Sequence, residues 1–291
     1  MRNAERWHET KFVSTARGLR ASRDRMHVSI GSRFITDIVA QWYERAIRAH
    51  ARGRLLDMGC GHVPLFGVYR DLVEETICID WANTLHPSIH LDFVVDLGGK
   101  LPFEDGSFDT ILLTDVLEHL AEPARAMCEA ARILRLDGKL IIGVPFFYWV
   151  HEEPHDYHRY TEFALQRMCR LSGLTVVELQ AYGGLPEILC DLTAKGLECL
   201  PRPLPALLRP LHVAAALLDA TWPIRKLSEH SKPSFPLGYV LVAEKRPPRA
   251  MGDRENHKQG AVPRSRVMTN RSARFETGGI ESFARLALWL R

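Results

Sequence analysis

The chain has 291 residues, which suits one large α/β domain with additions or two small domains. Its composition, 46% apolar and 25% charged, excludes wholesale disorder, a collagen-like chain and a polytopic membrane protein. The net charge of +3 is unevenly distributed, because residues 1–33 carry eight basic and three acidic side chains and residues 246–291 carry ten and four. The remaining residues, 34–245, carry 20 basic and 28 acidic side chains.

The acidic middle argues against a nucleic-acid groove across the main body, so we expect no nucleic acid as a partner. The basic ends would suit an anionic membrane surface, but a solvated flank is the simpler interpretation and peripheral membrane contact has no further support. The six cysteines include no CxxC pair and the N-terminus has no apolar signal region, which predicts reduced thiols and a cytoplasmic protein. The sequence does not indicate an oligomeric state.

In chain order, residues 1–33 are predicted to be a basic N-terminal extension without clear periodicity. Apolar side chains at spacings of three and four predict an amphipathic helix over residues 34–50. Short apolar runs then alternate with helical patterns. The predicted strands are Arg54–Met58, Thr76–Asp80, Leu91–Val95, Thr110–Thr114, Lys139–Val144, Thr175–Ala181 and Gly238–Glu244. The predicted helices between them are Leu65–Val73, Pro123–Arg135 and Glu162–Leu171.

This alternation predicts an α/β fold, a Rossmann-like, doubly wound, seven-stranded and mostly parallel sheet with helices on both faces. Residues 34–245 would form the main domain. A helical insertion at 182–236 precedes the last strand, with helices expected at 187–200 and 204–227. Residues 246–291 begin with a proline-rich stretch and are expected to form a basic, disordered tail.

The most specific local pattern is residues 55–61 (LLDMGCG), a strand that runs into a tight glycine turn. Glycines at 59 and 61 let a backbone approach a ligand closely. Asp80 ends the second strand, where a carboxylate can accept hydrogen bonds from ribose hydroxyls. Asp96 ends the third strand. Acids at consecutive strand ends indicate a purine nucleoside, as in NAD or S-adenosylmethionine.

Two features of this loop favour S-adenosylmethionine. A dinucleotide loop needs a small residue at position 64, where this chain has Pro64, which lacks the N–H that a phosphate would use. Asp57, just before the glycines, would repel a pyrophosphate and suits a cationic amino-acid ligand. An NAD-dependent oxidoreductase is therefore the less supported alternative.

The sequence resembles class I S-adenosylmethionine-dependent methyltransferases of the group related to ubiquinone and menaquinone biosynthesis methyltransferases. The resemblance covers about residues 54–181 and the final strand. The motifs that carry it are 56–61 (LDMGCG), 79–80 (ID), 96–97 (DL), 101–109 (LPFEDGSFD), 114–119 (TDVLEH), 132–135 (RILR) and 137–140 (DGKL). Val63 stands where this family usually has a third glycine, and Pro64 matches a subgroup with the pattern GCGxxP.

The resemblance implies a role for each matching position. The methionine half of the cofactor would lie against Asp57, Gly59, Cys60 and Gly61. Its ribose diol would be held by Asp80, its adenine would lie near Trp81, Asp96 and Leu97, and Thr114 and Asp115 would line the methionine and acceptor side. The alternative is that these residues form a structural turn only.

The loop after the fifth strand contains the zinc-protease pattern HExxH at His151–His155. Pro154 would break the helix that such a site requires, so we expect no metal there. We predict instead that this loop forms the acceptor site, with His155 or His151 as the base and Asp156 orienting it. Substrate contacts are predicted for Tyr157, Arg159 and Tyr160.

A second resemblance bears on the acceptor of this loop, and one alternative to the loop prediction stays open. Residues 155–161 (HDYHRYT) resemble a signature of a methyltransferase subgroup associated with polysaccharide and cell-surface glycan biosynthesis. Equally, Asp156 and Arg159 would serve as a buried pair that fixes the loop. Glu118 and His119 are expected to be structural.

The predicted function is transfer of a methyl group from S-adenosylmethionine to a small-molecule or glycan acceptor, at oxygen. Methylation at carbon or nitrogen would use the same fold. A non-catalytic cofactor-binding or interaction protein is the alternative from another class.

Overall fold

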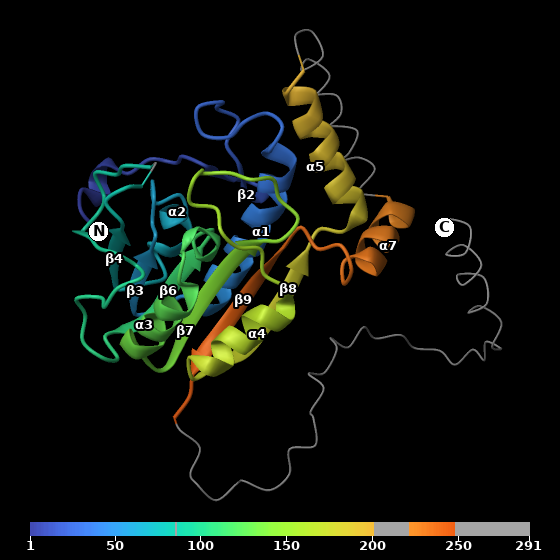
Figure 1. The fold of residues 1–291 in the computed structure, drawn as a ribbon. Helices are drawn as coiled ribbons and strands as arrows, with labels where there is room; N and C mark the ends of the chain where they lie inside the picture. The colour runs from blue at the N-terminus through green and yellow to red at the C-terminus, as the bar shows by residue number, and fades with distance from the viewer. Residues whose placement is uncertain (85, 201–220, 248–291) are drawn as a thin grey trace, which may run out of the picture. The chain divides into compact units, whose positions relative to one another are not determined.

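The computed structural model describes residues 1–84, 86–200 and 221–247, in which a seven-stranded sheet separates two layers of helices (Figure 1). The strand order is β5-β4-β3-β6-β7-β9-β8. Neighbouring strands from β5 to β7 run parallel, whereas β9 is antiparallel to both β7 and β8. The strands are β3 Arg54–Met58, β4 Glu75–Asp80, β5 Phe93–Val94, β6 Phe108–Thr114, β7 Leu134–Pro145, β8 Leu174–Tyr182 and β9 Gly238–Lys245.

Alternate residues of the central strands supply two separate apolar clusters, one on each face of the sheet. On β3, Leu55 belongs to the cluster with helix α1, whereas Leu56 belongs to the cluster with α3 and α4. Both side chains are fully buried. Because a strand places successive side chains on opposite faces, burial of both shows that the sheet is covered on both sides. The predicted doubly wound α/β fold is confirmed.

The helices agree with the predicted pattern except near the glycine loop. Helix α4 has the predicted bounds, and α1 and α3 differ from them by one or two residues at an end. The predicted helix at 65–73 is wrong in length, since only four residues, Phe66–Tyr69, are helical. The helices are η1 Ala4–Arg6, α1 Arg33–His50, α2 Phe66–Tyr69, η2 Leu117–His119, α3 Pro123–Ile133, α4 Glu162–Leu171, α5 Leu185–Glu198 and α7 Trp222–Ser231.

The basic N-terminal segment packs against the main domain instead of extending from it. It forms a hairpin of β1 (Phe12–Thr15) and β2 (Gly18–Ala21), and residues 1–247 form one compact unit. Phe12 and Leu19 are buried in the α1 cluster. The β2 backbone donates to α1 carboxylates, from Leu19 N to Glu44 at 2.7 Å and from Ala21 N to Asp37 at 2.8 Å. The hairpin thereby carries Lys11 to the carboxyl ends of the strands.

Part of the predicted insertion is described. Helices α5 and α7 lie between β8 and β9, as expected for a helical insertion before the last strand. Residues 201–220, where most of the second insertion helix was predicted, and the tail from 248 lie outside the described residues. Among the described helices, none has the length and apolar character needed to cross a membrane.

Candidate functional site

Two adjoining pockets lie at the carboxyl ends of the central parallel strands. The first has a volume of about 670 Å³ and the second a volume of about 620 Å³, and both volumes include the part that is open to solvent. Three side chains line both pockets: Asp115, His119 and Glu152. We call these three residues the shared wall. In an open α/β sheet, this edge is where ligands bind.

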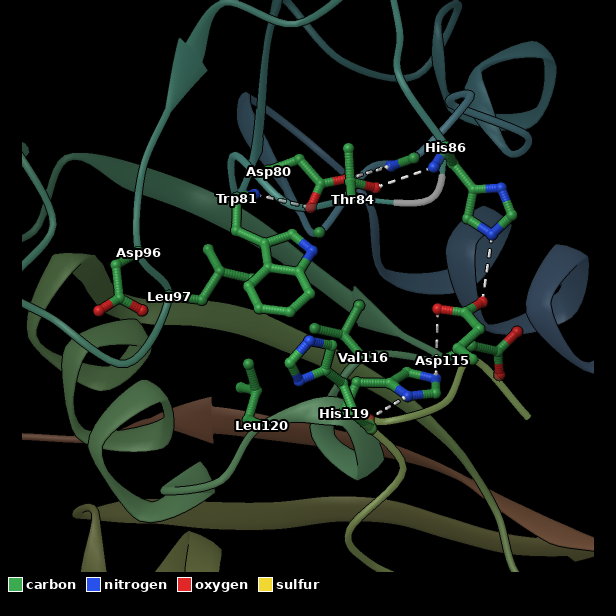
Figure 2. Close-up of a pocket in the computed structure, with 14 residues that line it drawn as sticks. Asp80, Trp81, Thr84, His86, Asp96, Leu97, Asp115, Val116, His119 and Leu120 are labelled. Carbon is green, nitrogen blue, oxygen red and sulfur yellow. Dashed lines mark hydrogen bonds and ion pairs between the residues drawn. The ribbon is translucent and has the colours of Figure 1, made fainter. Parts of the chain in front are cut away.

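The first pocket is built from four strand ends and the loop after β7 (Figure 2). Seven of the ten residues predicted to bind the cofactor line it. The lining residues are Gly59, Gly61, Asp80, Trp81, Thr84, His86, Asp96, Leu97, Asp115, Val116, His119, Leu120, Glu152 and His155. The topology therefore brings predicted residues that are far apart in the sequence into one cavity.

The glycine loop between β3 and α2 is fixed by its own backbone. The amides of Gly59 and Cys60 both donate to the Ile79 carbonyl, at 2.8 and 3.1 Å. Gly59 has a φ of 81°, and a Cβ there would lie 2.5 Å from a methyl carbon of Val116. Only glycine meets both conditions, so this turn requires the residue that the sequence has.

Val63 occupies the third glycine position of the resemblance and adopts a left-handed conformation, with a φ of 52°. A β-branched residue is rarely found there. Its side chain is fully buried, its amide donates to the Cys60 carbonyl at 2.8 Å, and its carbonyl accepts from the Trp7 indole at 3.0 Å. The surrounding contacts thus impose on Val63 the conformation that a glycine would adopt freely.

Asp80 at the end of β4 presents a half-satisfied carboxylate to the first pocket. One oxygen accepts from Gly61 N at 3.0 Å and the other from Trp81 N at 2.8 Å. Burial raises the pKa of this carboxyl, although the two backbone hydrogen bonds oppose that shift. Because a carboxylate oxygen has more than one lone pair, each oxygen can accept a further hydrogen bond from a diol.

Three predicted cofactor residues do not line either pocket: Asp57, Cys60 and Thr114. Asp57 is buried beneath the glycine loop and accepts a hydrogen bond from the Tyr69 hydroxyl at 2.9 Å. Burial raises the pKa of Asp57 to about 7, with a further contribution from the charge of Asp80, while the Tyr69 hydrogen bond opposes it. Its described side-chain hydrogen bond thus ties β3 to α2.

The adenine end predicted for the pocket contains Trp81, Asp96 and Leu97. The Trp81 ring meets the His155 ring edge-on, with centroids 4.7 Å apart. Asp96 accepts from the Gly98 amide at 2.9 Å, and Leu97 is buried at the pocket floor. This combination of an aromatic face, an apolar surface and a carboxylate suits a purine ring with an exocyclic amine.

The second pocket is lined by the N-terminal hairpin, α1, η2 and the loop after β7. Asp115, in its wall, accepts from the Tyr43 hydroxyl at 2.5 Å and from Lys11 Nζ at 2.9 Å. The lining residues are Lys11, Ile35, Thr36, Val39, Asp115, Glu118, His119, Pro145, Tyr148, His151, Glu152, Tyr182 and Leu237. The cavity thus combines an apolar surface from α1 with a cluster of polar and charged groups at and beside the shared wall.

The loop after β7 separates the two histidines that were predicted as alternative bases. His155 lies in the first pocket, with its Nδ1 3.0 Å from the Tyr157 hydroxyl. His151 lies in the second, where Asp156 accepts from its backbone amide at 3.0 Å and lies 3.3 Å from its Nδ1. The predicted pairing with Asp156 therefore exists for His151 and is absent from the described contacts of His155.

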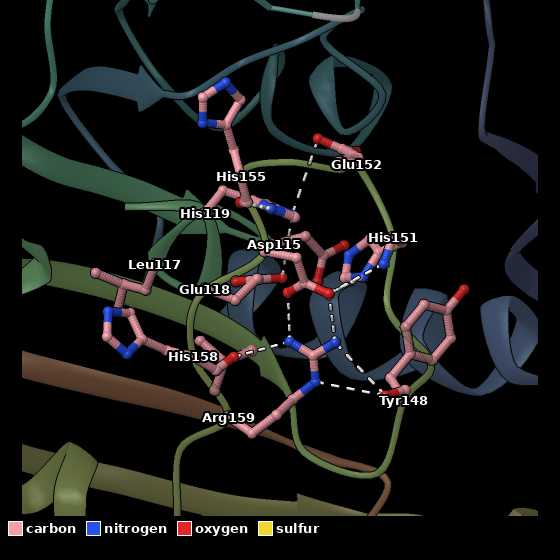
Figure 3. A network of polar contacts seen from close by, with 12 residues as sticks. Asp115, Leu117, Glu118, His119, Tyr148, His151, Glu152, His155, His158 and Arg159 are labelled. Atoms are coloured by element: carbon pink, nitrogen blue, oxygen red, sulfur yellow. Dashed lines mark hydrogen bonds and ion pairs between the residues drawn. The ribbon is translucent and has the colours of Figure 1, made fainter. Parts of the chain in front are cut away.

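Asp156 and Arg159 form the ion pair of the alternative interpretation of this loop, with the Asp156 carboxylate buried and a quarter of the Arg159 side chain exposed (Figure 3). The guanidinium contacts both carboxylate oxygens, at 2.5 and 2.8 Å, and donates to the Trp149 carbonyl at 2.9 Å. This pairing holds the pKa of Asp156 well below its usual range. Tyr160 is buried and donates to the Leu117 carbonyl at 2.8 Å. Arg159 and Tyr160 therefore fix the loop. None of the three residues predicted to contact substrate, Tyr157, Arg159 and Tyr160, lines either pocket.

Sequence reasoning predicted Asp115 of the shared wall, but missed His119 and Glu152 and the neighbouring Glu118. Glu118 was expected to be structural, yet it is fully buried and neither of its carboxylate oxygens has a hydrogen-bond partner among the described residues. Burial raises the pKa of Glu118 well above its usual range, with a further contribution from Asp115. Glu152 was assigned only to a discounted motif. The available signal was the adjacent pair at 118 and 119, directly after a strand end.

Residues 56–142 match the family model described as a methyltransferase domain. The chain is 49% identical over 111 residues to an uncharacterized 37.1 kDa transposon protein of Streptomyces fradiae, covering 34% of this chain and 32% of that protein. It is 31% identical over 103 residues to a ubiquinone biosynthesis O-methyltransferase of Xanthomonas oryzae, covering 32% and 43%.

A demethylmenaquinone methyltransferase of Renibacterium salmoninarum is 28% identical over 105 residues, covering 34% of this chain and 44% of that protein. The chain thus spans less than half the length of these relatives. A solved putative sarcosine dimethylglycine methyltransferase of Galdieria sulphuraria has a TM-score of 0.48 at 14% identity, covering 73% of this chain and 86% of that one.

Proposed function

From the match of residues 56–142 to the methyltransferase domain family, we propose that this chain is an S-adenosylmethionine-dependent methyltransferase. The proposed acceptor is a small molecule or glycan, methylated at a hydroxyl oxygen. The observation that carries the proposal is the first pocket, where a glycine turn, the Asp80 carboxylate and the side chains of Trp81 and Leu97 face one cavity. This cavity adjoins the second pocket.

The residues of the first pocket fit this cofactor. Asp80 can accept hydrogen bonds from two ribose hydroxyls. The turn at Gly59 and Gly61 has no side chains, so the cofactor can approach its main chain closely. Acidic side chains around the pocket complement the positive charge of a sulfonium. When bound, the cofactor supplies a methyl carbon that its sulfonium has already activated for displacement.

The second pocket is the proposed acceptor site, because only the shared wall separates it from the first. Its residues would position a hydroxyl and exclude water, which is most of what methyl transfer to an oxygen requires. The hydroxyl must also lose a proton, and polar side chains of the second pocket lie where this proton would leave. His151 belongs to this acceptor pocket, whereas His155 belongs to the cofactor pocket.

Calorimetric titration tests the cofactor assignment. We expect S-adenosylhomocysteine to bind and NADH not to bind, because Pro64 removes an amide that a pyrophosphate would use. Asp80→Ala should weaken S-adenosylhomocysteine binding by about 1–3 kcal/mol, the free energy of one to a few hydrogen bonds.

The matched control is Asp71→Ala, which removes an exposed carboxylate that lines neither pocket. The affinity of Asp71→Ala for S-adenosylhomocysteine should equal that of the unchanged chain. Binding of NADH but not of S-adenosylhomocysteine would overturn the proposal, and equal affinities of the two aspartate variants would show that Asp80 does not hold the ribose.

A non-catalytic cofactor-binding or interaction protein is the second candidate. Glu118 and His119 favour catalysis over this candidate, because a purely structural surface has no need for buried polar atoms without a hydrogen-bond partner in the described structure. Transfer of a labelled methyl group to a panel of sugars, phenols and amines separates the two candidates and distinguishes oxygen from nitrogen acceptors. Binding of the cofactor without transfer to any of them would favour the second candidate.

A further inference from the structure

We propose that Glu118, His119 and His151 form a binding site for a divalent transition-metal ion at the shared wall, and that this ion holds the acceptor oxygen. The inference rests on the proposed function for its role, but the metal site itself does not. The three side chains each present one ligand atom, and these atoms lie within 4.8 Å of one another (Figure 3).

The first support is an unsatisfied buried carboxylate. Glu118 is fully buried and both its oxygens lack a hydrogen-bond partner among the described residues. One oxygen lies 3.8 Å from His119 Nε2. An unpaired buried carboxylate costs several kcal/mol, and native proteins relieve this cost by protonation, by pairing or by metal coordination.

The second support is the tautomer that the neighbours impose on His119. Its Nδ1 lies 2.8 Å from the His155 carbonyl oxygen, so Nδ1 carries the proton and donates to it. Nε2 is then an unprotonated lone pair, and it too is buried without a partner in the described structure. A backbone carbonyl that fixes one ring nitrogen and frees the other is the usual outer shell of a metal-binding histidine.

His151 repeats this arrangement from the other side. Its Nδ1 lies 3.3 Å from the Trp149 carbonyl and 3.3 Å from an Asp156 carboxylate oxygen, both acceptors. Asp156 is itself held by Arg159, so the orientation of the ring is fixed by residues that line neither pocket. The Nε2 atom of His151 is left for a metal.

Ligand type and geometry define the class of metal. Two imidazoles and one carboxylate suit Zn²⁺, Co²⁺, Mn²⁺ or Fe²⁺ better than Ca²⁺ or Mg²⁺. Bonds of about 2.1 Å would require the three side chains to draw together by about 1 Å. Glu152 has an oxygen 3.8 Å from His119 Nε2, but its other oxygen contacts His86 and it lies outside the three-residue cluster.

The position of the site gives the metal a role. Glu118 and His151 face the second pocket and His119 faces both. A metal there would bind the acceptor hydroxyl and lower its pKa, so that the proton leaves to solvent and the metal-bound oxygen attacks the methyl carbon. The bond from that carbon to sulfur breaks and its electron pair stays on sulfur. The acceptor class is therefore an alcohol, diol or catechol.

The HExxH pattern thus contains a proposed ligand, but not in the set that the pattern implies. Residues 146–161 contain no helix, and His151 and His155 face different pockets. The proposed partners of His151 come from η2, at the end of β6.

Metal binding is tested on the full chain without an affinity tag, before any activity is sought. We expect about one equivalent of a divalent transition metal by elemental analysis, and visible absorption bands when Co²⁺ is added to chelator-treated protein. Glu118→Gln and His151→Ala should each weaken Co²⁺ binding by more than about 100-fold, because even outer-shell changes cost 10–100-fold.

The matched controls are Glu122→Gln and His230→Ala, which change exposed residues outside both pockets. Both should bind Co²⁺ like the unchanged chain. Binding of S-adenosylhomocysteine by His151→Ala, whose substitution lies outside the first pocket, verifies that the variant is folded.

The outcomes separate the two proposals. No stoichiometric metal, or equal Co²⁺ binding by Glu118→Gln, His151→Ala and their controls, overturns the metal site even if S-adenosylhomocysteine binds. Metal binding that depends on Glu118 and His151 without any binding of S-adenosylhomocysteine supports the site and overturns the proposed function.

Discussion

At the scale of single residues, Asp57 carries a consequence for stability. Its pKa is raised from 3.8 to about 7 by burial, so the folded chain binds this proton more tightly than the unfolded chain. The contribution of Asp57 to the free energy of unfolding is therefore greatest below pH 3.8 and declines as the pH rises to about 7.

Asp57→Asn should remove this decline, because an amide does not titrate. Urea unfolding at about pH 5 and about pH 8 should show a smaller loss of stability for the variant than for the unchanged chain, whose slope from this group is at most about 1.4 kcal/mol per pH unit. Asp71→Asn, at an exposed position, serves as the control. An unchanged pH dependence in Asp57→Asn would show that this carboxyl is ionised throughout.

The residue scale also shows what the sequence could reveal about the site. The strand ends at Asp80, Asp96 and Asp115 were recognisable, because acids directly after apolar runs are a local pattern. Glu118 was not, since its unsatisfied carboxylate depends on neighbours from distant segments. Arg159 was predicted to contact substrate, but its guanidinium group donates two hydrogen bonds to the Asp156 carboxylate, three residues earlier in the chain.

At the scale of elements, the N-terminal hairpin is the main departure from expectation. A short segment rich in arginine has no extended apolar pattern, and its apolar contacts are single residues such as Phe12 and Leu19. The strands of the sheet were predictable because each is a continuous apolar run. The length of helix α2 was overestimated, because some apolar residues of the segment 65–73 reach the core from turns and not from a helix.

Phe12→Ala tests how strongly the hairpin is held. Loss of this buried ring should lower the free energy of unfolding by about 3–5 kcal/mol if the whole unit unfolds together. Val13→Ala, at a half-buried neighbouring position, should cost much less. Equal thermal stabilities of the two variants would show that the hairpin does not dock on α1.

At the scale of the whole molecule, five separate segments converge on the first pocket. Binding of S-adenosylhomocysteine should therefore slow amide hydrogen exchange near Gly59–Gly61, Asp80–Trp81, Asp96–Leu97, Asp115–Leu120 and Glu152–His155. Exchange in α4, whose residues line neither pocket, should not change. Protection confined to α4, or spread evenly over the chain, would contradict this location of the site.

The charge distribution also has a structural explanation at this scale. Much of the acidic excess of residues 34–245 lies around the pockets, where Asp80, Asp96, Asp115, Glu118 and Glu152 line one or the other. The basic N-terminal segment supplies a counter-charge there, since Lys11 pairs with Asp115. The segment that composition alone assigned to a flank thus contributes to the electrostatics of the site.

The shared wall finally has a consequence for how two ligands would influence each other. Asp115, His119 and Glu152 each face both cavities, so a ligand that repositions them in one pocket changes the surface offered in the other. Thermodynamic linkage makes this effect reciprocal: whatever factor the first occupant applies to the affinity of the second, the second applies to the first. A wall one side chain thick would make the two binding events cooperative, favourably or unfavourably, without movement of any domain.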